Sequence, residues 1–282
     1  MSAAVGEGAV LLDVQATQSE GHRDRGVARY TAEFAEALLA GHSALIGGFL
    51  TNPDLAPPGR VEPLIASGLL VSADDAAFDH ARILHVASPF ELDVSVRRLW
   101  PQAASSRGLH LAVTLYDTIP ALFPERYLAD PGLRARYAAR VELVRAADAV
   151  FAISDATAAD GVKHFQLRED RVHVVGAAPS AMFARPAARA IAGQAARNAV
   201  PGLAEQFVLY TAGMDDRKNF HGLFRAWALL PAEVRRAWQL VMVCQMDDGS
   251  RNHLEHLARE AGIADELLMP GFVSDDTLRL LY

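Results

Sequence analysis

Short apolar runs alternate with helical patterns along most of the chain. The first apolar run, residues 9–13, ends in a polar loop, and from Val27 apolar residues recur at the spacing of one helical face. This alternation is typical of βα units that build a mostly parallel sheet. Further strands are expected at residues 44–50, 82–86, 109–115, 149–153 and 172–175, and helices at 131–147 and 155–165.

The alternation is interrupted once, at residues 177–202, where Ala, Pro and Gly are frequent and no clear strand is present. It then resumes with expected strands at 207–212, 239–244 and 267–269, and expected helices at 219–230, 251–261 and from Ser274 onward. We therefore expect two α/β domains, residues 1–183 and 207–282, joined by a linker at 184–206. The second stretch is short for a doubly wound domain, so this domain is expected to be incomplete.

The composition excludes several classes of protein. Of the 282 residues, 51% are hydrophobic and 22% are charged, which supplies a core and excludes a disordered chain. A net charge of −7 argues against electrostatic capture of nucleic acid. The single cysteine, Cys244, excludes an internal disulfide and suits a reducing compartment. No cationic leader precedes an apolar run and no apolar stretch approaches the roughly 20 residues that span a bilayer, so a cytoplasmic location is expected.

The most informative segment follows the first strand of the second domain. Gly213 permits a tight turn, and Asp215 and Asp216 are expected to cap a helix that has Arg217 and Lys218 in its first turn. The helix dipole disfavours cations at this end, whereas backbone N–H groups, a guanidinium and an ammonium together suit a phosphate or diphosphate. The alternative is that both cations are solvated and paired with the two aspartates.

The first domain offers a second set of candidates. Arg25 and Gly26 follow a strand and open a helix, so they either contact a diphosphate or acceptor or form an ordinary βα turn. Asp117 ends another strand at the same edge of the sheet. It either orients an acceptor hydroxyl or acts as a base, or it caps the turn before Pro120. Ser154 is expected to cap the helix that follows it. The histidines share no metal-ligand spacing, so no metal site is expected.

Four stretches carry a family resemblance. In chain order they are DVQATQSEGHRDRGVARYTAEF, LYDTIPALFPERYL, RAADAVFAISDATAADGV and GMDDRKNFHGLFRAWALLP. Together they resemble retaining glycosyltransferases of family 4, and the first is similar to polysaccharide mannosyltransferase-like members. The chain departs from this pattern at Ala28, and at Cys244 and Gln245, where the family commonly has glycine. The family's region with paired glutamates lies beyond Tyr282.

The resemblance implies the GT-B architecture, in which two Rossmann-like doubly wound domains face a cleft, here with the second domain incomplete. It implies transfer of a mannose-like hexose, with retention and without a metal or other cofactor, from GDP-mannose or a UDP-sugar to a saccharide or lipid-linked saccharide. A lipid-linked acceptor implies peripheral association with a membrane.

The resemblance also implies roles for particular residues. Arg217 and Lys218 would neutralise the diphosphate and act with Asp117 in catalysis. The residues that would bind the donor are Arg25, Gly26, Gly213 and Asn219. The alternative function is a non-catalytic nucleotide-sugar-binding or interaction protein with a degenerate GT-B fold.

Overall fold

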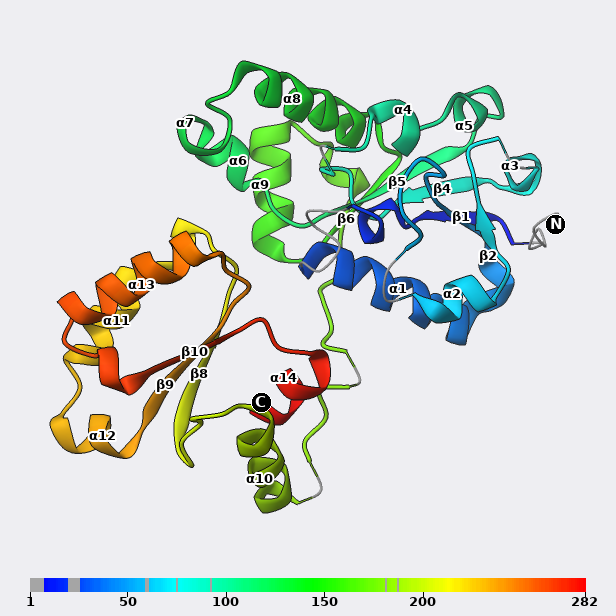
Figure 1. Cartoon of the computed structure of the whole chain (residues 1–282). Coiled ribbons are helices and arrows are strands. Elements are labelled where there is room, and N and C mark those ends of the chain that lie inside the picture. Colours follow the sequence, from blue (N-terminus) through cyan, green and yellow to red (C-terminus); the bar gives the residue numbers. More distant parts are fainter. Residues whose placement is uncertain are drawn as a thin grey trace. The chain divides into compact units, whose positions relative to one another are not determined.

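The computed structural model describes residues 8–19, 26–58, 61–74, 76–91, 93–180, 182–186 and 188–282. The chain divides into two compact units, residues 1–178 (unit 1) and 179–282 (unit 2) (Figure 1). Arg25 lies outside the described residues. Each unit contains a sheet in which all strand pairs are parallel. The expected α/β class, with a large sheet and a smaller second sheet, is confirmed.

Unit 1 contains a seven-stranded sheet with the order β3-β2-β1-β4-β5-β6-β7. Its strands are β1 (Val10–Asp13), β2 (Ile46–Leu50), β3 (Leu70–Val71), β4 (Ile83–Val86), β5 (His110–Leu115), β6 (Ala149–Ala152) and β7 (Val172–Val174). The chain proceeds from β1 outward to β3 and then returns to place β4 on the other side of β1. The strand order therefore reverses between β1 and β4, the position at which open α/β sheets bind ligands beyond the carboxyl ends of their strands.

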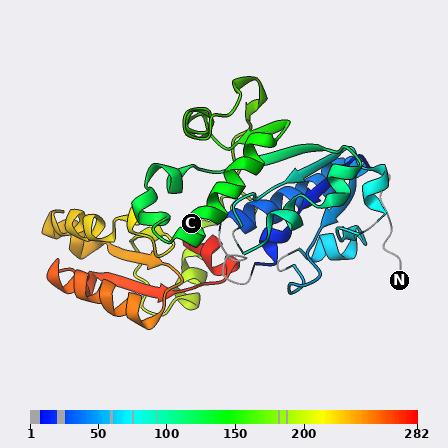
Figure 2. The ribbon, with the colours of Figure 1, turned by 90° about the horizontal axis from the view of Figure 1, so that it is seen from above.

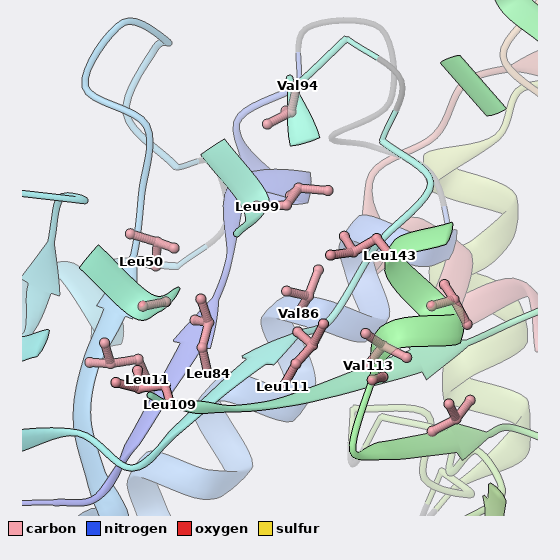
Figure 3. Close-up of a cluster of buried hydrophobic side chains, with 14 of the residues drawn as sticks. Leu11, Leu50, Leu84, Val86, Val94, Leu99, Leu109, Leu111, Val113 and Leu143 are labelled. Atoms are coloured by element: carbon pink, nitrogen blue, oxygen red, sulfur yellow. The ribbon is translucent and has the colours of Figure 1, made fainter. Parts of the chain in front are cut away.

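Helices cover both faces of this sheet (Figure 1). They are α1 (Gly26–His42), α2 (Glu62–Ala66), α3 (Ala77–His80), α4 (Val96–Leu99), α5 (Gln102–Ser106), α6 (Ile119–Leu122), α7 (Pro124–Tyr127), α8 (Pro131–Ala146) and α9 (Asp155–Phe165). Leu11 packs with α4, α5 and α8 in one core, whereas its neighbour Leu12 packs with α1 and α2 in another. Figure 3 shows the first core, in which Leu84 and Val86 accompany Leu111 and Val113. Burial on both faces explains why the strands are almost continuously apolar.

Unit 2 contains a three-stranded sheet with the order β10-β9-β8, drawn from yellow to red in Figures 1 and 2. Its elements are α10 (Arg189–Ala199), β8 (Phe207–Thr211), α11 (Phe220–Ala228), α12 (Ala232–Ala237), β9 (Gln239–Val243), α13 (Asp248–Glu260), β10 (Leu267–Gly271) and α14 (Asp275–Leu281). One face packs against α11 and α13, and the other packs against α10 and α14. The three strands of unit 2 are therefore arranged in the same order as the first three strands of unit 1, β3-β2-β1.

None of the helices in the described ranges combines the length and the apolar character that crossing a membrane requires.

Candidate functional site

The turn that carries the two cations of unit 2 lies between β8 and α11. Arg217 and Lys218 belong to a 3₁₀ turn, Asp216–Lys218, and α11 begins only at Phe220. The prediction that both cations lie in the first turn of the helix, capped by Asp215 and Asp216, is therefore wrong. The cap is Asn219, which adopts the left-handed conformation (φ 49°, ψ 50°) and separates the 3₁₀ turn from the helix. Both cations lie immediately before the amino end of α11.

Asn219 has a clear structural function. Its Oδ1 accepts a hydrogen bond from the backbone N–H of Gly222 at 3.1 Å. A Cβ atom at position 222 would lie 2.3 Å from Nδ2 of Asn219, so the cap requires glycine there. Gly213 is exposed, and a Cβ atom added to it would meet no atom within 4 Å. The geometry thus gives Asn219 a capping role, and its predicted contact with the donor stays a prediction.

Substitution of Asn219 tests the capping role. Asn219→Ala is expected to lower the free energy of unfolding by about 1–2 kcal/mol, because the cap is lost. Asn219→Gly is the matched control and should cost only a few tenths of a kcal/mol, because glycine is favoured both at this cap position and at positive φ. Urea unfolding of the two variants measures both values. Equal losses would contradict the capping role.

Arg217 forms an ion pair with Asp215. Its Nε and Nη2 atoms donate to the two carboxylate oxygens at 3.0 and 3.1 Å, and its backbone N–H donates to Oδ1 at 2.9 Å. The Arg217 side chain remains 40% exposed. The pairing that the sequence offered as the alternative interpretation is thus present for Arg217. A partly exposed pair of this kind contributes about 0–1 kcal/mol, so it presents a small barrier to an incoming anion.

Lys218 differs from Arg217. Its side chain is exposed, and its ammonium group has no hydrogen-bond or ion-pair partner among the described residues. Its backbone is held in place, because its carbonyl accepts a 2.7 Å hydrogen bond from the hydroxyl of Tyr210 on β8. Tyr210 also contacts the ring of Phe220, with 6.0 Å between centroids. A fixed turn therefore presents, beyond the carboxyl end of β8, a cation that no described residue pairs with.

The candidates of unit 1 lie at the carboxyl edge of its sheet. Gly26 is the first residue of α1, and a Cβ atom there would meet nothing within 4 Å. Asp117 follows β5, is exposed, and accepts a 3.0 Å hydrogen bond from the N–H of Ile119 through Oδ1. The capping alternative for Asp117 is thus present, and the residue is exposed to solvent. Tyr30 of α1 contacts Tyr116 of the same edge, with ring centroids 5.3 Å apart.

Ser154 caps α9 as expected, with its Oγ accepting from the N–H of Thr157 at 3.1 Å. Within the described ranges, no group of three or more His, Cys, Asp and Glu side chains is arranged to hold a metal ion.

The structure reveals buried polar residues behind this edge that the sequence interpretation did not assign to a site. Asp13, at the end of β1, is 1% exposed, and Arg140 on α8 is 2% exposed. Burial raises the pKa of the Asp13 carboxyl to about 7, although hydrogen bonds from Gln15 oppose this shift. Burial also lowers the pKa of Arg140, opposed by the charges of Glu91 and Asp13. In the sequence, Asp13 and Gln15 are distinguished only by their place in the first of the four stretches that resemble the glycosyltransferase family. The one feature of the sequence that could have marked Asp13 as a functional residue is its position at the end of an apolar strand.

No protein-family model matches the chain. It is similar to the serotype-specific mannosyltransferase WbdA of Escherichia coli, with 28% identity over 304 aligned residues that cover 97% of this chain and 36% of that protein. A second WbdA sequence is 32% identical over 168 residues, 59% of this chain and 20% of that protein. The chain thus spans about a third or less of the length of these relatives.

Solved structures share its fold. HepE from Anabaena, in complex with UDP, gives a TM-score of 0.63 at 14% identity and matches 97% of this chain and 71% of that chain. WaaG, a glycosyltransferase involved in lipopolysaccharide biosynthesis, gives 0.59 at 15% identity, over 96% and 72% of the two chains. These matches confirm the predicted GT-B fold class. The chain is therefore a homologue of part of a mannosyltransferase, with the fold of HepE and WaaG.

Proposed function

We propose that this chain is a glycosyltransferase that moves a mannose-like hexose from a nucleotide sugar to a saccharide or lipid-linked saccharide, with retention of configuration. The observation that carries the proposal is Lys218 beside Arg217 on a fixed turn beyond β8, with no ion-pair partner for Lys218 in the described part of the chain. Homology to part of WbdA, a mannosyltransferase, supports the choice of a mannose-like sugar, and GDP-mannose is the proposed donor of such a sugar. The complex of HepE with UDP supports a UDP-sugar as the other candidate.

The proposed chemistry is electrostatic. As the bond between the sugar and the diphosphate breaks, negative charge develops on the leaving group, and cations already in place stabilise it. Lys218 supplies one positive charge, and no ion pair with a described residue has to break before it binds the diphosphate. Arg217 supplies a second positive charge. Its planar guanidinium binds two phosphate oxygens after its weak ion pair with Asp215 breaks. The amino end of α11 adds the positive end of its dipole.

Unit 1 is proposed to bind the acceptor. Asp117 holds its turn with Oδ1 and presents Oδ2 for a hydroxyl group of the acceptor. Attack from the same face as the leaving group requires no protein nucleophile and gives retention. A rival proposal is a protein that binds nucleotide sugars without turnover, in which the Arg217 guanidinium stays paired with Asp215.

Substitution of Lys218 tests the proposal directly. Lys218→Ala is expected to weaken the affinity for GDP or UDP roughly ten- to hundredfold, because a charge-assisted hydrogen bond is lost. The chain has only one other lysine, Lys163 on α9, which is also exposed. Lys163→Ala is therefore the matched control and should leave the affinity unchanged. Titration calorimetry measures both, after a thermal-shift screen with GDP, UDP and their sugars identifies the base.

The monophosphates GMP and UMP sharpen this test. The loss caused by Lys218→Ala should be smaller for them than for the diphosphates. Equal dissociation constants in Lys218→Ala and the unmodified protein would contradict the proposed site. Diphosphate binding without sugar transfer to any saccharide would favour the rival proposal.

A further inference from the structure

A buried polar cluster lies behind the carboxyl edge of the unit 1 sheet, where the strand order reverses. Its members are Asp13 at the end of β1, Gln15 in the following 3₁₀ turn, Glu91 after β4, and Arg140 on α8. They are 1%, 1%, 7% and 2% exposed, respectively. We call these four residues the Asp13 cluster. Charged residues are rarely buried to this degree unless they are paired or functional.

Hydrogen bonds from this region connect the loops that follow the strands. The amide of Gln15 donates to Asp13 Oδ1 at 2.8 Å and to the carbonyl of Arg98 at 3.0 Å, which joins β1 to α4. Arg140 Nη2 donates to the carbonyl of Glu91 at 3.0 Å and to that of Val94. The segment after β1 and the loop after β4 are thus held by the same few side chains.

The loop after β2 is held in a similar way by Gln18, which is 3% exposed. Its side-chain amide donates to the carbonyls of Asn52 and Ala56 at 3.0 and 2.9 Å, and its Oε1 accepts from the N–H of Asn52 at 2.8 Å. Hydrogen bonds of Asp13, Gln15 and Gln18 therefore hold together the segments that follow three neighbouring strands, β1, β2 and β4.

Several polar atoms of the cluster have no hydrogen-bond partner among the residues that the structure describes. They are Asp13 Oδ2, Gln15 Oε1, and Nε and Nη1 of Arg140. No hydrogen bond joins Asp13 to Arg140 in the part of the chain that the structure describes. A buried polar group without a partner is destabilising, and proteins normally satisfy such groups with internal water. Acceptors on Asp13 and Gln15, together with donors on Arg140, provide the two to four partners that such a water needs.

We propose that the Asp13 cluster binds internal water with which Asp13 exchanges its proton, and that the cluster positions the loops after β1 and β4 for a ligand at the point where the strand order of unit 1 reverses. The last part rests on the proposed function, in which unit 1 binds the acceptor. Asp13 acts as a positioning residue, because it is too buried to contact the acceptor itself.

The surroundings of Asp13 set its proton affinity. Burial raises its pKa to about 7, the hydrogen bonds from Gln15 lower it, the negative charge of Glu91 raises it, and the positive charge of Arg140 lowers it. Among the described residues, the hydroxyl of Tyr116 also interacts electrostatically with Asp13, since burial raises the pKa of Tyr116 and the charge of Asp13 raises it further. Because the pKa is raised in the folded state, folding favours the protonated carboxyl. The stability from this group is fully present below pH 4 and declines as the pH rises to about 7.

Two measurements test the inference. The carboxyl ¹³C resonance of Asp13, assigned by its absence in Asp13→Asn, is expected to titrate near pH 7. The unfolding equilibrium constant of the unmodified protein, divided by that of Asp13→Asn, is expected to rise about a hundredfold from pH 5 to pH 8. Asp79→Asn, which alters an exposed carboxylate of unit 1, is the control and should give a flat ratio. A titration near pH 4, or a flat ratio for Asp13→Asn, would overturn the inference.

The positioning role has a separate readout. The pH profile of KM for the acceptor should lose its inflection near pH 7 in Asp13→Asn, while the affinity of unit 2 for GDP or UDP stays unchanged. An unaltered acceptor profile would overturn the positioning role even if Asp13 titrates near neutrality. Failure of the proposed function appears instead as an absence of nucleotide binding in the unmodified protein, which leaves the titration of Asp13 unaffected.

Discussion

The double variant Arg217→Ala, Lys218→Ala is expected to transfer sugar with a kcat/KM that is lower by a factor of about 1,000 or more. Removing one preorganised group that stabilises charge in a transition state typically lowers kcat about 100- to 1,000-fold. Here two cations on one turn would act on the same diphosphate, so their effects should not simply multiply. Transfer is measured with the nucleotide sugar that gives the largest thermal shift with the unmodified protein.

Unit 1 provides a matched control for this double variant. Arg168 forms the same type of pair as Arg217, donating through Nε and Nη2 to both oxygens of an aspartate two residues away, Asp170, at 3.0 and 2.6 Å. The variant Lys163→Ala, Arg168→Ala therefore removes the same two charges and a similar ion pair, and it should transfer sugar at the normal rate. If the two double variants have similar kcat/KM values, the turn between β8 and α11 has no part in catalysis.

Much of the fold could be predicted because its signals are local. Strands buried on both faces are almost continuously apolar, as in the run of residues 9–13, and such runs indicate a parallel sheet when helices separate them. The short elements were not predicted. Strand β3 has two residues, Leu70 and Val71, and its pairing with β2 depends on contacts that no periodicity reveals. A strand or helix must be several residues long before its hydrophobic pattern can be recognised in the sequence.

The candidate site shows the same limit in more detail. The glycine turn, the cations after β8 and a helix from residue 219 were visible in the sequence, but the residue that caps α11 was not. Asp215, Asp216 and Asn219 are all favourable cap residues, and the sequence does not rank them. The choice of Asn219 depends on its left-handed backbone and on Gly222, which leaves room for its side chain. The cations therefore precede the helix.

The Asp13 cluster could not be predicted from the sequence, for a different reason. Arg140 binds the carbonyl of Glu91 across 49 residues of chain. In the sequence, Arg140 is one of several arginines in a helix, most of which are exposed to solvent. Only the folded packing of α8 against the loop after β4 distinguishes it from the others.

Arg140→Ala is expected to lower the free energy of unfolding by about 3–5 kcal/mol. The variant removes the donor for the carbonyls of Glu91 and Val94, and it removes the buried positive charge that favours the ionised form of Asp13. Arg140→Met should cost less, because it retains volume and also removes the two unpaired donors of the guanidinium. Arg136→Ala, on the exposed side of the same helix, is the control and should stay within about 0.5 kcal/mol of the unmodified protein.

The size and the pH dependence of this loss connect Arg140 to Asp13. Arg140 favours the ionised form of Asp13, so the pKa of Asp13 should rise above about 7 when this cation is removed. The loss caused by Arg140→Ala should therefore be larger at pH 8, where Asp13 is otherwise ionised, than at pH 5, where it is protonated. Urea unfolding at the two pH values gives both numbers. A loss that is the same at pH 5 and pH 8 would mean that the two side chains do not share a proton-linked cluster.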